Sequence, residues 1–99
     1  MEMNIQRDGK VLTVIPEGRI DTLTAPEFLD QVEAVRGDAD ELIVDFDKVT
    51  YVSSAGLRVL LTLAQEMEDR DGSIKGINVS DFLRKAFSLT GFLDILNVD

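Results

Sequence analysis

The 99-residue sequence contains neither cysteine nor histidine. The absence of cysteine excludes disulfides, thiolate metal sites and cysteine nucleophiles. The absence of histidine removes the commonest general base and the usual transition-metal ligand. A hydrolase would need a serine–lysine or a carboxylate pair instead, and no convincing pair stands out. We therefore expect a protein that is not an enzyme and that carries no cofactor and no metal.

Long hydrophobic runs and an excess of positive charge are also absent. No apolar run approaches the roughly 20 residues of a membrane-spanning helix, and residues 1–4 lack the positive region and the apolar core of a signal peptide. The 19 acidic residues outnumber the 10 basic ones, which gives a formal net charge of −9. Such a surface repels nucleic acid and anionic lipid. We expect a cytoplasmic protein that binds neither nucleic acid nor a membrane.

The composition is that of a folded protein. Its hydrophobic fraction of 44% is typical of globular chains. Ninety-nine residues are enough for one hydrophobic core and too few for two. We expect residues 1–99 to form one domain.

The first quarter of the chain predicts a β-hairpin. Residues 3–6 alternate between apolar and polar, as a half-buried strand does. Asp8-Gly9 is a strong hairpin-turn dipeptide. A second strand follows over residues 10–15 and should end at Pro16, which has no N–H to donate. Residues 18–21 are predicted to form a connector.

A first helix should begin at Thr24. The run Thr24-Ala25-Pro26-Glu27 matches a capping box, in which Glu27 reaches back to the N–H of the capping residue. Helical spacing predicts one buried stripe, and Gly37 should end the helix. The stripe consists of Ala25, Phe28, Leu29, Val32 and Val35. Residues 38–41 are predicted to be a solvated polar turn.

Residues 42–46 form the most hydrophobic strand candidate and should be covered on both sides, between other strands. After a turn over residues 47–50, a second helix is expected from Ala55 to about Glu68. Its outer face should carry Arg58, and its inner stripe is predicted to contain Leu57, Leu60, Leu61, Ala64 and Met67.

The last third of the chain predicts another strand–helix unit. A strand is expected over residues 74–79, followed by a helix that Ser80 or Asp81 caps and Gly91 ends. The residues predicted to pack inward from this helix are Phe82, Leu83, Ala86 and Phe87. Residues 92–98 form a closing segment that the pattern leaves open as helix or strand. The strand–helix alternation after the hairpin predicts an α/β fold with a mixed sheet.

Three stretches carry a resemblance to a known family. Ser53-Ser54-Ala55-Gly56-Leu57-Arg58 after a buried strand resembles the signature of the STAS domain, the fold of bacterial anti-sigma factor antagonists. Gly18-Arg19-Ile20-Asp21 with Thr24-Ala25-Pro26-Glu27-Phe28 is similar to the family's segment before its first helix. Leu89-Thr90-Gly91-Phe92 is similar to its late helix-ending element. The resemblance implies a small sheet with helices packed mainly on one face.

The two serines permit two interpretations. A serine at a helix start can cap the free backbone N–H groups, and the same N–H groups and the helix dipole also suit a phosphate. The best-known form of the family carries its phosphoacceptor immediately before the glycine, where this chain has Ala55. A second form reads Ser-Ser-Ala-Gly-Leu-Arg, as here, and its candidate is the serine before the alanine. We therefore expect Ser54 to be the phosphoacceptor, with Ser53 as the alternative.

The resemblance also implies partners and a docking surface. An anti-sigma factor antagonist binds an anti-sigma factor, usually a serine protein kinase, and releases its sigma factor; an opposing phosphatase would reverse the phosphorylation. The partner-binding residues implied are Asp21, Thr22, Ser53, Ser54, Gly56 and Arg58. Without a partner, Asp21 would be a solvated loop residue. Gly56 would then reflect close approach of a neighbouring backbone, or tolerance of glycine at a frayed helix end.

Other function classes remain as alternatives. A STAS module can have an unswitched scaffold role or a nucleotide-sensing role. A response-regulator receiver would use Asp45 as phosphoacceptor, but its acidic pair after the first strand and its lysine after the fifth are not visible. A small enzyme is the remaining alternative.

Overall fold

The computed structural model describes residues 1–98. Its main sheet contains β1 (Met3–Asp8), β2 (Val11–Pro16), β4 (Glu41–Asp45) and β6 (Ser73–Ile77) in the order β1-β2-β4-β6. The β1–β2 hairpin is antiparallel, and the pairs β2–β4 and β4–β6 are parallel. The mixed sheet predicted from the sequence is therefore confirmed.

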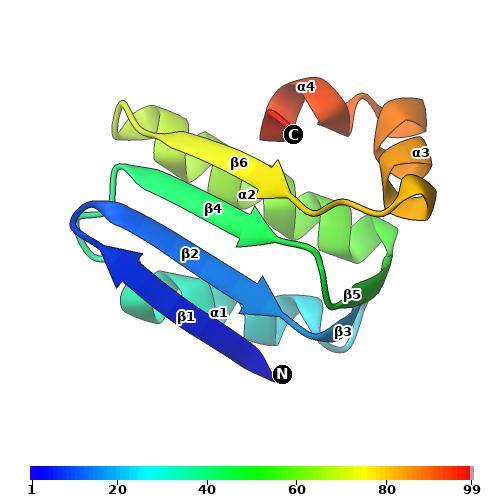
Figure 1. The fold of residues 1–99 in the computed structure, drawn as a ribbon, viewed down its shortest axis with the longest axis horizontal. Helices are drawn as coiled ribbons and strands as arrows, with labels where there is room; N and C mark the ends of the chain where they lie inside the picture. The colour runs from blue at the N-terminus through cyan, green and yellow to red at the C-terminus, as the bar shows by residue number, and fades with distance from the viewer. Residues whose placement is uncertain (99) are drawn as a thin grey trace.

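Helices α1 (Ala25–Arg36) and α2 (Ser54–Asp69) lie behind the same face of this sheet (Figure 1). The parallel strands β2, β4 and β6 are added in one direction, so successive right-handed crossovers place both helices on one side. Alternate strand residues face these helices and are buried, among them Leu12, Val14, Leu42, Val44 and Ile74. The helices thus cover mainly one face, as the resemblance implied. The prediction that residues 42–46 are covered on both sides is wrong, because Ile43 on the other face is only half-buried.

A second, two-stranded parallel sheet pairs β3 (Gly18–Ile20) with β5 (Val49–Val52). The sequence patterns predicted a connector and a turn for these segments. Backbone hydrogen bonds between distant segments make them strands instead, including that from Gly18 N to Lys48 O at 2.8 Å. Pairing between segments about 30 residues apart is not evident from the local sequence pattern, because strand formation depends on tertiary context.

Helix α2 is rotated relative to the predicted stripe. Its buried residues are Gly56, Leu60, Leu63 and Met67. Leu63 is fully buried although the sequence analysis did not place it in the core, whereas Leu57, Leu61 and Ala64 are half-buried.

The capping box predicted at Thr24 does not form. The Thr24 side chain makes no cap hydrogen bond, because its hydroxyl donates instead to Arg19 O at 2.6 Å. Glu27 pairs with the amino group of Met1. Helix α1 begins at Ala25, one residue after the predicted start at Thr24, and is followed by Gly37, as predicted.

The chain closes with α3 (Asp81–Thr90) at one end of the sheet and α4 (Phe92–Leu96) beside the β6 edge (Figure 1). Ser80 caps α3 by accepting a hydrogen bond from Leu83 N, and Gly91 follows its last turn. The segment left open in the sequence analysis is thus helical, although Val98 then forms a parallel bridge with Gly76. The prediction that Phe82 packs inward is wrong, since 65% of its surface is exposed.

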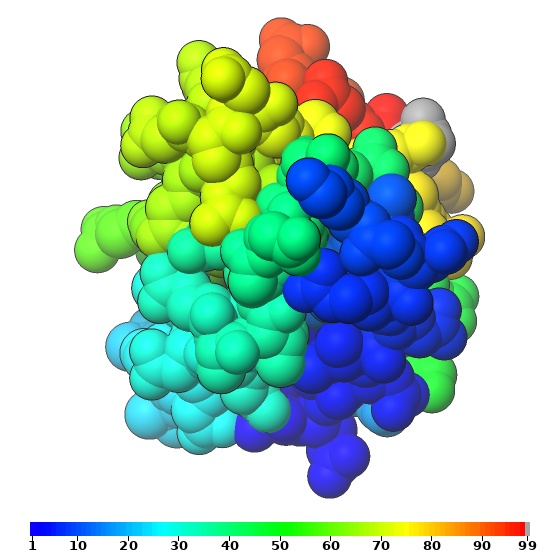
Figure 2. Space-filling view, turned by 90° about the vertical axis from the view of Figure 1, so that its left-hand side faces the viewer, coloured from blue at the N-terminus to red at the C-terminus, as the bar shows by residue number. Residues whose placement is uncertain are grey.

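The two ends of the sheet differ in what they carry. Figure 2 shows the end formed by the β1–β2 turn, the loop after α1 and the turn after α2. There Arg70 donates to the carbonyl oxygens of Gly37 and Ala39 at 2.9 and 3.0 Å, which ties two turns together. The serine pair lies at the opposite end, where the parallel strands terminate (Figure 1).

Candidate functional site

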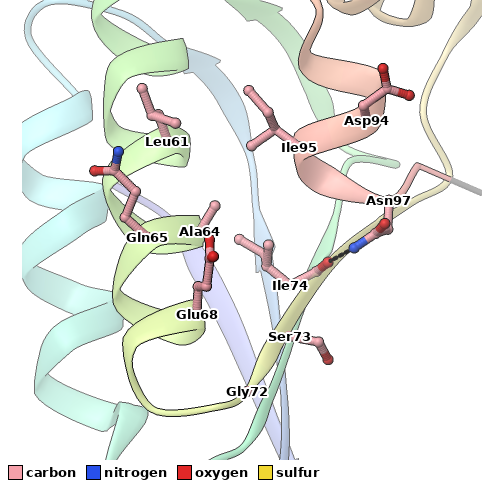
Figure 3. A pocket seen from close by; sticks show the side chains of 10 residues that line it. All are labelled: Leu61, Ala64, Gln65, Glu68, Gly72, Ser73, Ile74, Asp94, Ile95 and Asn97. Atoms are coloured by element: carbon pink, nitrogen blue, oxygen red, sulfur yellow. Dashed lines mark hydrogen bonds between the residues drawn. The ribbon is translucent and has the colours of Figure 1, made fainter.

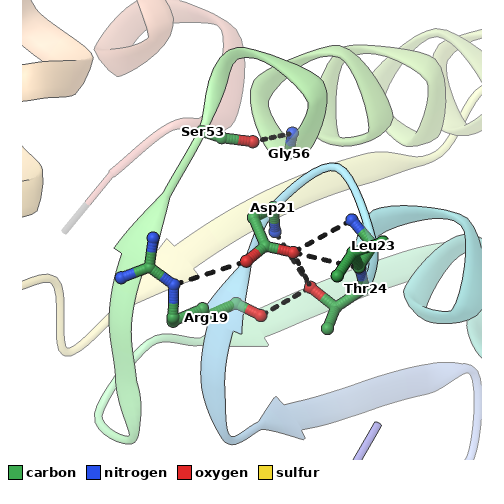
Figure 4. A network of polar contacts seen from close by, with 6 residues as sticks. All are labelled: Arg19, Asp21, Leu23, Thr24, Ser53 and Gly56. Carbon is green, nitrogen blue, oxygen red and sulfur yellow. Dashed lines mark hydrogen bonds and ion pairs between the residues drawn. The ribbon is translucent and has the colours of Figure 1, made fainter.

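The start of α2 is held against β3. Ser53 N donates to Ile20 O at 2.9 Å, so the strand β5 enters the helix directly beside the end of β3. The loop Asp21–Thr24 continues from Ile20 and lies next to this helix start (Figure 4). Two segments about 30 residues apart in sequence therefore form one surface.

Ser53 is the N-cap residue of α2. Its backbone is extended, with φ −84° and ψ 177°, and its side chain accepts a hydrogen bond from Gly56 N at 3.2 Å (Figure 4). This bond pairs one of the helix N–H groups that lack an intrahelical partner. Ser53 is half-buried, and its side chain stabilises the start of the helix.

Ser54 is the first residue of α2 and is exposed. No acidic residue occupies the first turn of the helix, so no carboxylate competes for its dipole there. Arg58 lies four residues later and is also exposed, and residues four apart lie on the same helix face. Ser54 and Arg58 therefore present a hydroxyl and a cation on one outer strip of α2.

Gly56 is required by the packing of α2 on β3. A Cβ atom at this position would lie 2.5 Å from Ile20 O and 2.8 Å from Val52 Cγ1. Real Cβ atoms do not make contacts this short, so only glycine lets the helix approach so closely. Of the explanations left open for Gly56, close approach of a neighbouring backbone is confirmed. Gly56 is buried, so it shapes the surface without a side chain of its own.

Asp21 organises the loop beside the helix start. Its Oδ1 accepts hydrogen bonds from Leu23 N at 3.0 Å and Thr24 N at 3.2 Å (Figure 4). Its backbone N–H donates to Thr24 Oγ1 at 2.9 Å. The Thr24 N–H lowers the pKa of Asp21 most, with the Leu23 N–H and the Arg19 side chain acting in the same direction against the opposing effect of burial. The carboxylate thus holds the loop in one conformation rather than standing free in solvent.

Arg19 links this loop to β5. Its Nε lies 3.3 Å from Asp21 Oδ2, and its guanidinium carbon lies 4.4 Å from the centre of the Tyr51 ring. An arginine over an aromatic face is attracted by the ring's electrons. The pair therefore braces β3 against β5.

Leu23 is an exposed apolar residue that the sequence analysis missed. It lies at the tip of the loop with 82% of its surface exposed, next to Thr22, which is also exposed. A leucine between two threonines, outside the stripe of α1, was the available indication. Isolated exposed leucines are ordinary on protein surfaces, but this one lies beside the serine-bearing helix start.

Asp45 lies apart from this surface, at the end of β4. Its Oδ1 accepts hydrogen bonds from Asp47 N at 2.9 Å and Asn78 Nδ2 at 3.0 Å. Within residues 1–98 no three acidic side chains gather closely enough to hold a metal ion. In the same range, no helix has both the length and the apolar character needed to cross a bilayer.

A family model described as "Mlab, STAS domain" matches residues 3–97. The chain belongs to the STAS family. Among curated relatives, an anti-sigma-B factor antagonist of Staphylococcus aureus is 26% identical over 102 residues, covering 100% of this chain and 94% of the relative. The protein of the same name from Listeria monocytogenes is 28% identical over 94 residues, covering 94% and 82%.

Solved STAS structures share the fold. The anti-sigma factor antagonist SpoIIAA in its unphosphorylated form superposes with a TM-score of 0.83 at 17% identity, over 99% of this chain and 88% of that one. An anti-sigma factor antagonist from Mycobacterium paratuberculosis gives 0.85 at 23% identity, over 98% and 83%. The phosphorylated form of Bacillus SpoIIAA gives 0.76 at 17% identity, over 99% and 91%. At these identities the likeness establishes the fold alone.

Proposed function

We propose that this STAS chain is a cytoplasmic anti-sigma factor antagonist: it binds an anti-sigma factor of the serine kinase type and thereby releases a sigma factor. The observation that carries the proposal is the exposed Ser54 at the start of α2, beside the ordered Asp21–Thr24 loop. The printed names of the curated relatives support the partner class. An opposing phosphatase completes the cycle. The chain's own role is binding rather than catalysis.

The docking surface consists of the β3–α1 loop and the outer strip of α2. Thr22, Ser54 and Arg58 offer exposed polar groups, and Leu23 supplies an apolar anchor of the kind that fills a partner's pocket. The shape of this surface is held by Ser53, Asp21 and Gly56. Each of these residues fixes the local backbone geometry through a hydrogen bond or a close backbone contact.

Ser54 is the better phosphoacceptor of the two serines. The Ser53 side chain accepts the Gly56 N–H bond and is half-buried, so a kinase would have to break the cap to reach it. Ser54 is exposed and needs no such rearrangement.

Phosphorylation would act through local charge. A phosphate adds about −1.5 to −2 charge at pH 7, which the free N–H groups and the dipole of α2 can accept without loss of the fold. The partner would meet a dianion in place of a hydroxyl on a chain already at −9. If desolvation and repulsion cost about 2.8 kcal/mol, affinity falls about a hundredfold.

The test is labelling of Ser53→Ala and Ser54→Ala in parallel by the serine kinase that the wild-type chain binds, with peptide mapping by mass spectrometry. We expect Ser54→Ala to abolish labelling and to keep binding, whereas Ser53→Ala should still be labelled. Because Ser53→Ala removes a helix cap, its circular dichroism spectrum is recorded alongside. Undiminished labelling of Ser54→Ala would overturn the assignment. Absence of any label on the wild-type chain would favour an unswitched STAS module.

The docking surface has its own test. Arg58→Glu and Leu23→Asp should each weaken the complex measured by calorimetry while the melting temperature stays nearly unchanged, because both side chains are exposed. Thr50→Asp, an exposed change on β5 outside this surface, is the control. Wild-type affinity in both variants would place the interface elsewhere.

A further inference from the structure

Helix α3 carries an apolar strip that the fold does not cover. Phe82 and Leu89 are exposed by 65% and 80%. Seven residues at 100° each return to within about 20° of the starting direction, so the two side chains lie on one line along the helix. Lys85 is three residues from Phe82 and four from Leu89, and it is exposed as well. The strip therefore has two apolar ends and a cation beside its middle.

The charge of α3 sets it apart. Its sequence holds Asp81 against Arg84 and Lys85, a net charge of +1. Every other helix that the structure describes is net negative: α1 and α2 each hold one cation against three anions, and α4 holds only Asp94. The apolar strip thus lies on the one positively charged helix of an acidic chain.

A groove of about 380 Å³ lies between α2, β6 and α4. Leu61 and Ala64 of α2 face Ile95 of α4 across it, and Ile74 lies at its floor (Figure 3). Glu68 on α2 and Asp94 on α4 place carboxylates at its borders. The groove is therefore large enough for apolar side chains and negative at its rim.

We propose that α3 of one chain docks into this groove of a second copy, with Phe82 and Leu89 against its apolar walls and Lys85 beside Glu68 or Asp94. The two surfaces are opposite in charge, and each combines apolar with charged side chains, which is the complementarity an interface needs. Pairing α3 with α3 would bring two Lys85 side chains together, and pairing groove with groove would bring carboxylates together. The contact therefore pairs unlike surfaces: made once between two copies it is head-to-tail and builds a ring or an open chain, and made twice it closes a two-fold dimer. It does not depend on phosphorylation.

The test is sedimentation velocity over rising concentration of the purified chain. We expect the average mass to rise above 11.0 kDa; a plateau at twice that value indicates the two-fold dimer, and a continued rise indicates head-to-tail contacts. Leu89→Asp on α3 and Ala64→Lys in the groove should each reduce the association constant by at least about tenfold. Thr50→Asp is the control, because it also places a carboxylate at an exposed position, on β5 and outside both α3 and the groove, and it should associate like wild type.

Mixing the two variants decides the geometry. Leu89→Asp retains an intact groove and Ala64→Lys retains an intact α3, so an equimolar mixture should form a species of two chains and nothing larger. Circular dichroism verifies that both variants are folded. A wild-type chain that stays monomeric at millimolar concentration overturns the proposal. So does a mixture that fails to pair, or a Thr50→Asp variant that loses association as fully as Leu89→Asp.

Discussion

Replacing Gly56 by alanine tests the central packing contact of the site. In most helices this change is favourable by up to about 1 kcal/mol, because glycine is a poor helix former. Here the new Cβ would lie 2.5 Å from Ile20 O, 2.8 Å from Val52 Cγ1 and 3.0 Å from Ile20 Cγ2. The nearest of these atoms belongs to the backbone, so no side-chain rotation relieves the contact.

Inserting a methyl group into a packed site costs typically about 1–3 kcal/mol, and a contact with backbone belongs in the upper part of that range. Subtracting the gain in helix propensity leaves an expected loss of about 1–2 kcal/mol in the free energy of unfolding. Helix α2 must also move away from β3, which strains the hydrogen bond from Ser53 N to Ile20 O. We therefore expect Gly56→Ala to weaken partner binding as well.

The assay is urea unfolding of wild type, Gly56→Ala and Ser54→Ala, with the midpoint compared at constant slope. Ser54→Ala is the control, because it introduces alanine two residues earlier at an exposed position, and its stability should stay within about 0.5 kcal/mol of wild type. A Gly56→Ala protein as stable as wild type, or more stable, would refute the close-approach explanation.

Three further predictions concern stability. Leu63→Ala should lower the free energy of unfolding by about 2–5 kcal/mol. The loss should exceed that of Leu57→Ala, because of these two leucines only Leu63 is fully buried. Equal losses in denaturant titrations would mean that the buried face of α2 is assigned wrongly. Ser53→Ala should cost about 1 kcal/mol through loss of the cap while Ser54→Ala does not, and comparable melting temperatures for the two would contradict the assigned cap. The pKa of Asp21 lies below its ordinary value of 3.8 in the folded protein, so its contribution is present above that value and is lost as the pH falls through the folded-state pKa. Asp21→Asn should therefore make the free energy of unfolding less dependent on pH below about 4. An unchanged pH dependence in this variant would show that Asp21 does not contribute to the acid sensitivity of the fold.

The local sequence determined those elements whose ends are set by turn or capping residues. The Asp8-Gly9 hairpin, the α1 boundary at Gly37 and the Ser80 cap of α3 all appear as predicted. Each depends on residues within a few positions of one another, where turn geometry and capping act. The family signature likewise lies in one short stretch, Ser53–Arg58, and the helix predicted to follow these serines begins at Ser54.

Sequence alone did not determine which partner each residue finds. Thr24 and Glu27 have the spacing of a capping box, but Arg19 O and the amino group of Met1 compete for them in the folded chain. For Leu23 the sequence offered only its place between two threonines, because its exposure depends on where the loop tip points. The role of Asp21 as the organiser of that loop also appears only in the hydrogen bonds.

The rotation of α2 relative to its predicted buried stripe shows most clearly what the sequence pattern could not determine. Apolar residues cover much of its circumference, so its sequence is compatible with more than one inner face. Gly56 is the one position in the first turn without a side chain, and it must face Ile20 for the helix to approach β3. Leu60, Leu63 and Met67 then follow at helical spacing onto the buried side. The sequence by itself determined that a helix begins after Ser53, and only the contact with β3 decided which side of that helix became core, because that contact joins residues more than 30 positions apart.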